Sequence, residues 1–248
     1  MIVAVPTVQK AVDLLSRAQV DSGGQVTSFE LFSRDTLALV LKNIPGTRDP
    51  IATPAHWYCL IEFSSGQQGV VRGMAEAILS AAFEAGEIKD AAIAENLAQA
   101  GAFWHLRHSM SQAMKPEGAQ AKHDVSVSVS LIPKFLEKAD AAVMTACPGA
   151  RVIAFGHLGD GNIHFDVLRP VELSDKAFRE KQYTIEQAVY DVISSLDGSI
   201  SAEHGIGVAR RDELARRKSK TELAAMKAIK MALDPNDIMN PGKMLAEY

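Results

Sequence analysis

The chain has 248 residues, 47% of them hydrophobic, so it is long enough to bury a sizeable core as one large domain or two small ones. Its formal charge of -4 and its lack of a basic run argue against nucleic acid or an anionic membrane as the main partner. No apolar run approaches the roughly 20 residues of a membrane span, and the apolar start is too short for a signal peptide, so a cytoplasmic protein is expected. Cys59 and Cys147 lie far apart in apolar surroundings, as buried thiols do.

The N-terminal half alternates apolar strands with amphipathic helices. Apolar residues recur at helical spacing from Val8 to Ala18, and Gly23-Gly24 ends that helix. Ser33 and Asn96 stand where their side chains can cap later helices. The predicted elements of this half are strands at 2–5, 25–32, 57–63 and 90–94, and helices at 8–18, 34–42, 73–85 and 97–114.

The second half continues in the same way. Val125, Val127 and Val129 alternate with serines, which predicts a half-buried strand. The other predicted elements are a helix at 132–145, a strand at 151–155, a long helix with its apolar stripe from 185 to 196, a charged helical face at 209–220 and an amphipathic helix at 223–233. The strand-helix-strand order, seen twice, favours an antiparallel sheet covered on one side by helices, as in ferredoxin-like α+β domains. No linker divides the chain, so we expect one domain over residues 1–248.

The segment from Phe155 to Val167 contains two histidines around a turn. Asp160-Gly161 favours a two-residue hairpin loop, which would place His157 directly opposite His164. Cross-strand partners have Cβ atoms roughly 4.5–5.5 Å apart, a separation that one divalent metal can bridge. In the second strand Ile163, Phe165 and Val167 fall on one face, and His164 and Asp166 on the other. The pattern predicts a metal site, although a hairpin can also carry two histidines that each bind a neighbour.

A third ligand is expected from the glycine-flanked segment Ser201–Gly207. Neighbouring side chains on an extended segment point to opposite sides, so Glu203 can reach the metal while His204 points elsewhere. Zinc suits two imidazoles and one carboxylate, and manganese or iron would also fit this ligand set. The alternative is a surface turn that leads into the next helix.

Three stretches together resemble one protein family. HLGDGNIH at 157–164, AEHGIG at 202–207 and NPGKML at 240–245 are similar in order and spacing to motifs in the C-terminal half of the FAD-linked D-2-hydroxyacid dehydrogenases, which include D-lactate dehydrogenases, glycolate oxidase subunits and D-2-hydroxyglutarate dehydrogenase. The resemblance covers nearly the whole chain. The family's FAD-binding domain precedes this region, and nothing here resembles its glycine-rich flavin loops. The resemblance therefore implies a fragment, the substrate- and metal-binding cap domain of the FAD-linked oxidase C-terminal type.

The resemblance also implies substrate-binding residues. Arg107 and Ser111 are four residues apart and are expected to share one helix face, where an arginine can grip a carboxylate. Together with Lys122 they match the arginine, hydroxyl residue and lysine with which the family binds substrate. Asp166 follows His164 on the ligand face and either orients a ligand or contacts substrate. Asn240, in the polar tail, matches a position that contacts the flavin in the family.

One departure concerns His123, which stands where the family commonly has an aromatic residue such as tyrosine. This difference puts the exact shape of the substrate in doubt.

The implied reaction is oxidation of a small D-2-hydroxy acid to the 2-oxo acid by hydride transfer to FAD. A metal on His157, His164 and Glu203 would hold the hydroxyl and one carboxylate oxygen, and His204 would accept the hydroxyl proton. Arg107 and Lys122 would fix the carboxylate so that C2 faces the flavin. Without its flavin domain, the chain alone is expected to be inactive in hydride transfer.

Two other functions remain open. A stand-alone metal-dependent hydrolase would use the same site to activate water and would turn over without flavin. A non-catalytic subunit would bind metal and a hydroxy acid only. The particular hydroxy acid, the electron acceptor after the flavin and any homo-oligomer formation are not determined by these patterns.

Overall fold

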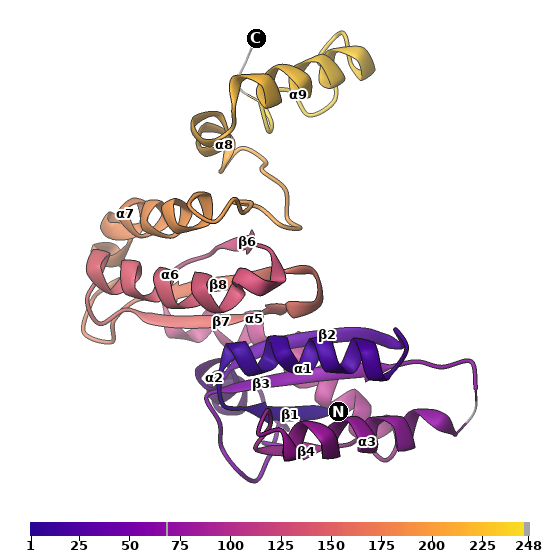
Figure 1. Ribbon diagram of the computed structural model, residues 1–248. Helices are drawn as coiled ribbons and strands as arrows, with labels where there is room; N and C mark the ends of the chain where they lie inside the picture. The colour runs from indigo at the N-terminus through magenta and orange to yellow at the C-terminus, as the bar shows by residue number, and fades with distance from the viewer. Residues whose placement is uncertain (68, 246–248) are drawn as a thin grey trace.

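The computed structural model describes residues 1–67 and 69–245, and within them the strands form one eight-stranded sheet (Figure 1). All strand pairs are antiparallel, and the strand order is β4-β1-β3-β2-β7-β8-β5, with β6 also paired to β8. The strands are β1 (Ile2–Val5), β2 (Val26–Ser33), β3 (Trp57–Phe63), β4 (Asp90–Ala92), β5 (Gln120–Ala121), β6 (Asp124–Ser126), β7 (Arg151–His157) and β8 (Asn162–Leu168). The antiparallel α+β prediction is confirmed.

Helices cover both faces of the sheet. The helices are α1 (Val8–Asp21), α2 (Arg34–Asn43), α3 (Val70–Glu84), α4 (Leu97–His108), α5 (Met110–Ala113), α6 (Ile132–Ala146), α7 (Asp175–Ser194), α8 (Arg211–Arg217) and α9 (Lys220–Leu233), with 3-10 helices η1 (Lys115–Glu117), η2 (Val129–Leu131) and η3 (Leu158–Asp160). One apolar core lies under α1, α3, α6 and α7, and a second lies under α2, α4 and α5. The expectation of a sheet covered on one side was wrong, because strand residues that alternate between faces are apolar on both.

The expected caps are present at two helix starts. Ser33 Oγ accepts from Thr36 N at 3.2 Å at the start of α2, and Asn96 Oδ1 accepts from Gln99 N at 3.0 Å at the start of α4. The helix predicted to continue from Asn96 to Met114 is interrupted, however, because Ser109 separates α4 from α5. Cys59 and Cys147 are both free and buried, as expected.

The β7–β8 connection differs from the predicted hairpin. Phe155, not His157, lies opposite His164, so the register is offset by two residues from the prediction. The connection contains η3, and Gly161 follows it with φ +83°. Because side chains alternate with a period of two, this offset leaves His157 and His164 on the same face, as diagonal rather than direct neighbours.

The strand predicted through Val129 is shorter than its alternation suggested. The ladder with β8 ends at Ser126, after which Val127 N donates to Gly161 O at 3.2 Å and η2 begins at Val129. Ser126 exchanges two backbone hydrogen bonds with Ser199, which brings the segment before Glu203 against the sheet. The alternation of valines and serines thus continues beyond β6, because the chain leaves the sheet after Ser126.

The C-terminal helices stand apart from the layered body (Figure 1). Helix α8, whose Leu214 is buried, is bound to α7 through Arg217, whose Nη2 lies 2.7 Å from Asp191 Oδ1. None of the residues of α9 is buried, although the sequence predicted an amphipathic helix here. Across the described part of the chain, no helix is both long and apolar enough to cross a membrane.

The close contact at Gly156 provides a test of the β7–β8 register. A Cβ at Gly156 would lie 2.3 Å from Asn162 O, whereas a Cβ at Gly159 would meet no atom within 4 Å. We therefore expect Gly156→Ala to lower the free energy of unfolding by roughly 1–3 kcal/mol, measured by urea denaturation. Gly159→Ala is the matched control and should change it by less than about 0.5 kcal/mol. Equal stabilities of the two variants would contradict the register described.

Candidate active site

Four neighbouring strands bring charged side chains to one face of the sheet. Glu30 on β2 lies opposite His157 on β7, and Asp124 on β6 lies opposite His164 on β8. The neighbouring positions Phe32 and Phe155 on this face belong to the core under α2, α4 and α5. The polar cluster therefore begins where that apolar core ends.

Glu30 is the most buried member of one half of the cluster, with 2% of the residue exposed. Its Oε1 accepts from His157 Nδ1 at 2.8 Å, and its Oε2 accepts from Arg107 Nε at 2.9 Å. Burial by itself would raise the pKa of the Glu30 carboxyl, but His157 and Arg107 outweigh it and lower that pKa. The hydrogen bond to Glu30 in turn raises the pKa of His157.

Glu203 lies between the two predicted metal-binding imidazoles. Its Oε1 is 3.0 Å from His164 Nε2, and its Oε2 is 3.8 Å from His157 Nε2. The donors fit a divalent metal by type, because two imidazole nitrogens and a carboxylate suit zinc, iron or manganese. The predicted trio is connected through Glu203; its two histidines are diagonal neighbours on the sheet.

A second set of donors is more compact. Among the described residues, the group of potential ligand atoms that all lie within 4.8 Å of one another is Asp124, His164 and His204. Asp124 Oδ2 is 3.2 Å from His204 Nδ1, and it also accepts the backbone N–H groups of Glu203 at 3.1 Å and His204 at 2.7 Å. Asp124 thus holds the Glu203–His204 segment against β6. His204 Nε2 lies 3.6 Å from Glu203 Oε1 and its ring centre 5.5 Å from that of His164, so the expectation that His204 points elsewhere was wrong. Burial lowers the pKa of His164.

The predicted substrate residues are only partly brought together. Arg107 is buried at the end of α4, with its guanidinium carbon 5.2 Å from the centre of the Phe155 ring. Lys122 lies between β5 and β6 and is exposed, and its charge acts to lower the pKa of Asp166. Ser111 lies on α5 and is exposed, so it does not share one continuous helix face with Arg107, contrary to the expectation.

Asp166 and His123 are buried next to each other. Asp166 Oδ1 accepts from the backbone N–H of His123 at 3.3 Å, and burial raises the pKa of Asp166 to about 7. His123 Nδ1 lies 2.8 Å from Phe165 O, and its ring packs edge-on against Phe165 and Tyr190. Burial lowers the pKa of His123 to about 4, so this histidine is a neutral core residue at neutral pH.

Asn240 lies in the exposed tail, away from any contact that would fix its side chain among the described residues. Its backbone has φ +53°, and its carbonyl accepts from Lys243 N at 3.2 Å. The tail returns to the segment after His204, because Met244 N donates to Gly207 O at 2.8 Å. The predicted flavin contact of Asn240 stays a prediction.

Sequence reasoning missed the two buried carboxylates that organise the site, Glu30 and Asp124. Each has a signal in the sequence. Glu30 interrupts the apolar run Phe29–Phe32 at an inward-facing position, and Asp124 stands immediately before a valine-rich strand. A charged residue in a buried strand must be paired, so it indicates partners elsewhere in the chain, but it does not identify them.

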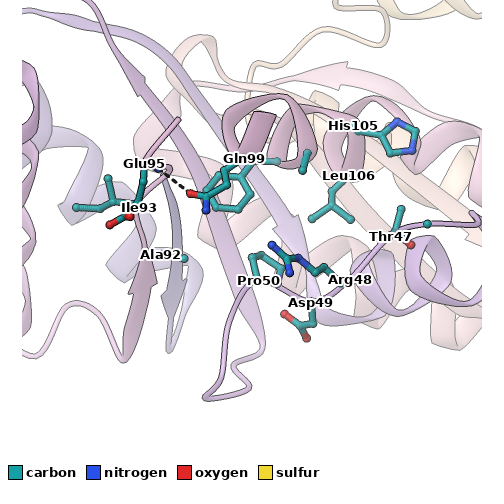
Figure 2. Close-up of a pocket in the computed structure, with 13 residues that line it drawn as sticks. Thr47, Arg48, Asp49, Pro50, Ala92, Ile93, Glu95, Gln99, His105 and Leu106 are labelled. Carbon is teal, nitrogen blue, oxygen red and sulfur yellow. Dashed lines mark hydrogen bonds between the residues drawn. The ribbon is translucent and has the colours of Figure 1, made fainter. Parts of the chain in front are cut away.

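A separate pocket of about 530 Å³ lies on the same side of the sheet, between the loop at 46–50 and α4. Figure 2 shows Thr47–Pro50 on one side and Gln99, His105 and Leu106 on the other. Gln99 Oε1 accepts from the backbone N–H of Glu95 at 2.7 Å. None of the predicted site residues lines this pocket.

Residues 1–244 match the family described as FAD linked oxidases, C-terminal domain. The chain belongs to this family. The recognition of FAD-linked oxidases from the three motifs is therefore confirmed, as is the fold class.

Several curated relatives of this FAD-linked oxidase domain are named D-2-hydroxyglutarate dehydrogenase. The protein of Stutzerimonas stutzeri (strain A1501) is 36% identical over 223 residues, which cover 89% of this chain and 47% of the relative. The mitochondrial protein of Arabidopsis thaliana is 35% identical over 232 residues, with 94% of this chain and 40% of the relative covered. The chain thus spans about half or less of the length of these relatives.

Solved structures show the same fold at low identity. Substrate-bound p-cresol methylhydroxylase aligns with a TM-score of 0.63 at 14% identity, over 99% of this chain and 52% of that chain. Alkyldihydroxyacetonephosphate synthase aligns with a TM-score of 0.55 at 14% identity, over 97% of this chain and 43% of that chain. These similarities concern the architecture alone.

The buried His123 predicts a pH dependence of stability. In the unfolded chain its pKa is near the usual 6.5, so between about pH 6.5 and 4 the unfolded state takes up a proton that folded His123 does not. The free energy of unfolding should therefore fall as pH falls through this window, by roughly 3 kcal/mol from this group. Asp166, whose pKa is raised in the folded state, makes the free energy of unfolding rise as pH falls. This contribution is the same in the wild type and in a His123→Phe variant.

The difference between wild type and His123→Phe isolates the contribution of His123. Urea denaturation at pH 7, 5.5 and 4 should give a flatter curve for the variant. His105→Phe, at an exposed position, is the control and should follow the wild type. Parallel curves for wild type and His123→Phe would contradict the neutral, buried state.

Proposed function

We propose that this chain is the substrate-binding part of a flavin-dependent enzyme that oxidises a D-2-hydroxy acid to the 2-oxo acid. The observation that carries the proposal is the meeting of Arg107, His157, His164, Glu203 and His204 on one face of a sheet of the FAD-linked oxidase family. The names of the relatives favour D-2-hydroxyglutarate as substrate. FAD, when bound, would supply the hydride acceptor, and a divalent metal would polarise the substrate hydroxyl.

The chain's own residues would bind and orient the acid. Glu30 Oε2 lies 2.9 Å from both Nε and Nη2 of Arg107, which leaves Nη1 for a substrate carboxylate. Lys122 is exposed near Asp166 and would add a second positive charge to that carboxylate. Both contacts would restrict the orientation of C2, which is positioning catalysis. Ser111 and Asp166 would make weaker contacts with the same acid.

His204 would accept the hydroxyl proton. Its Nδ1 faces Asp124, so its Nε2 is the nitrogen that faces Glu203 and the space beside His164. The exposed fraction of its side chain is 60%, so the imidazole is accessible to a bound ligand. An imidazole with one nitrogen tied to a buried carboxylate keeps the other nitrogen as acceptor, as general-base catalysis requires.

The metal would be held by His157, His164 and Glu203. We favour zinc, and manganese or iron suit the same donors. Support comes from the donor types and from the orientation of His157, whose Nδ1 is bound to Glu30 while its Nε2 faces Glu203. His204 and Asp124 are assigned to proton transfer and positioning.

The missing partner would be the FAD-binding domain that precedes this region in longer members of the family. The chain covers 47% and 40% of the length of the two D-2-hydroxyglutarate dehydrogenases described above. Helix α9 and the following tail expose Ile229, Leu233 and Ile238, which such a domain could cover. A cytoplasmic location stays a prediction, since the Arabidopsis relative is named mitochondrial.

The hydrolase and the non-catalytic subunit are the alternatives, and they differ from the proposal in the turnover that they predict. A hydrolase would turn over without flavin, and a non-catalytic subunit would bind metal and acid with no turnover after the flavin domain is added. Family membership favours the redox function over the hydrolase.

The metal is tested by elemental analysis of the purified chain grown in supplemented medium. We expect about one equivalent of zinc, manganese or iron, and its loss in a His157→Ala, His164→Ala double variant. A His56→Ala, His105→Ala double variant removes two histidines outside the site and should retain the metal. No metal in the wild type would refute the metal part of the proposal.

Lys122 is tested in the protein joined to its flavin domain. Because Lys122 is exposed, Lys122→Met should fold normally, yet it removes a charged contact worth roughly 1.5–3 kcal/mol. The KM for D-2-hydroxyglutarate, measured by anaerobic flavin reduction, should therefore rise about 10- to 100-fold. Lys115→Met, at another exposed lysine, is the control. An unchanged KM in Lys122→Met would remove this lysine from the substrate site.

A further inference from the structure

We propose that Glu30 is a positioning residue that links the substrate-binding arginine to the metal-binding histidine. The inference rests on the proposed function, because it concerns the roles given there to Arg107 and His157. Glu30 would not contact substrate or metal itself. It would hold both groups in one arrangement, so that binding of the metal and of the acid depend on the same buried carboxylate.

The geometry of Glu30 is that of a bridge. Its Oε1 accepts from His157 Nδ1 at 2.8 Å and from Ser28 Oγ at 2.8 Å, and its Oε2 accepts from Arg107 Nε at 2.9 Å. His157 Nδ1 also lies 2.8 Å from Oε2, so one carboxylate serves both His157 and Arg107. The partners come from three elements, β2, β7 and α4, and Glu30 is 77 residues from Arg107 and 127 from His157 in the chain.

The bond to His157 determines which nitrogen of that ring can bind a metal. Because Nδ1 donates its proton to a carboxylate, the lone pair of the neutral ring lies on Nε2, which is 3.8 Å from Glu203 Oε2. A carboxylate in this place also fixes the ring plane. Loss of such a partner typically weakens metal binding 10- to 100-fold.

The bond to Arg107 determines which edge of the guanidinium is available. Glu30 Oε2 lies 2.9 Å from both Nε and Nη2, so this carboxylate covers that edge of the guanidinium and leaves Nη1 for an anionic ligand. Glu30 therefore fixes which edge of the Arg107 guanidinium a ligand can reach.

A purely structural ion pair is the competing explanation. It would stabilise the fold without affecting ligand affinities, and such pairs are often dispensable for stability. The two explanations differ in what the loss of the charge changes. The bridge requires metal affinity and acid affinity to fall together, whereas the structural pair requires only a change in thermal stability.

The test compares the full chain with its Glu30→Gln variant, which keeps the side-chain shape but has one amide nitrogen that cannot accept. Zinc affinity is measured by competition with a chelator, and affinity of the zinc-loaded chain for D-2-hydroxyglutarate by calorimetry. We expect the zinc Kd to rise 10- to 100-fold and the Kd for the acid to rise at least 10-fold. Glu62→Gln, on the neighbouring strand β3 and exposed, is the matched control and should change neither.

A second variant, Glu30→Asp, keeps the charge and shortens the reach. It should retain zinc or acid affinity better than Glu30→Gln, since one of the two contacts can still form. If Glu30→Gln does not fold, Glu30→Asp is compared directly with the wild type. Rescue of at least one affinity by the conservative variant is a result that a purely structural role does not predict.

The outcomes separate this inference from the proposed function. If the wild type binds zinc and acid and both Glu30 variants bind them equally well, the bridge is refuted and the proposed function stands. If the wild type binds no metal, the proposed metal site and the bridge are both refuted.

Discussion

The antiparallel pairing of β7 with β8 is the contact on which the rest of the structure depends. β7 joins the sheet to β2 and the N-terminal half, and β8 joins it to β5 and β6. Gly156 permits the close approach of the two backbones, since a side chain there would meet Asn162 O. The register that results makes His157 and His164 diagonal neighbours, while β2 places Glu30 opposite His157 and β6 places Asp124 opposite His164. The β7–β8 pair thus joins the two halves of the candidate site.

The sheet uses the two faces of these strands differently. Ile163 and Phe165 face a core under α6 and α7, and the alternate positions carry His164 and Asp166. Charged side chains at these buried strand positions are costly unless they are paired. Pairing is achieved by Glu30 with Arg107 and by Asp124 with the backbone of the Glu203–His204 segment. These bonds give the site its order before any ligand binds, which is the arrangement that positioning catalysis needs.

The positions of most helices and strands could be predicted because they depend on local patterns. Apolar periodicity, the caps at Ser33 and Asn96 and the glycines after α1 gave strands and helices close to those observed. The errors arose where distant contacts override the local pattern. The alternating valines after Asp124 predicted a longer strand. The chain instead forms η2, because Val127 N donates to Gly161 O in the β7–β8 turn. The β7–β8 turn adopted η3, where a two-residue loop had been expected from Asp160-Gly161.

The sequence by itself determined the family, the α+β class and the two histidines that share a sheet face, because each depends on motifs or on a period of two that an even register offset preserves. Only the tertiary structure decided which residues support them. Glu30 and Arg107 are 77 residues apart, and Asp124 is 80 residues from His204. No local propensity encodes such pairs, because they form only when the strand order brings the segments together and burial makes an unpaired charge costly.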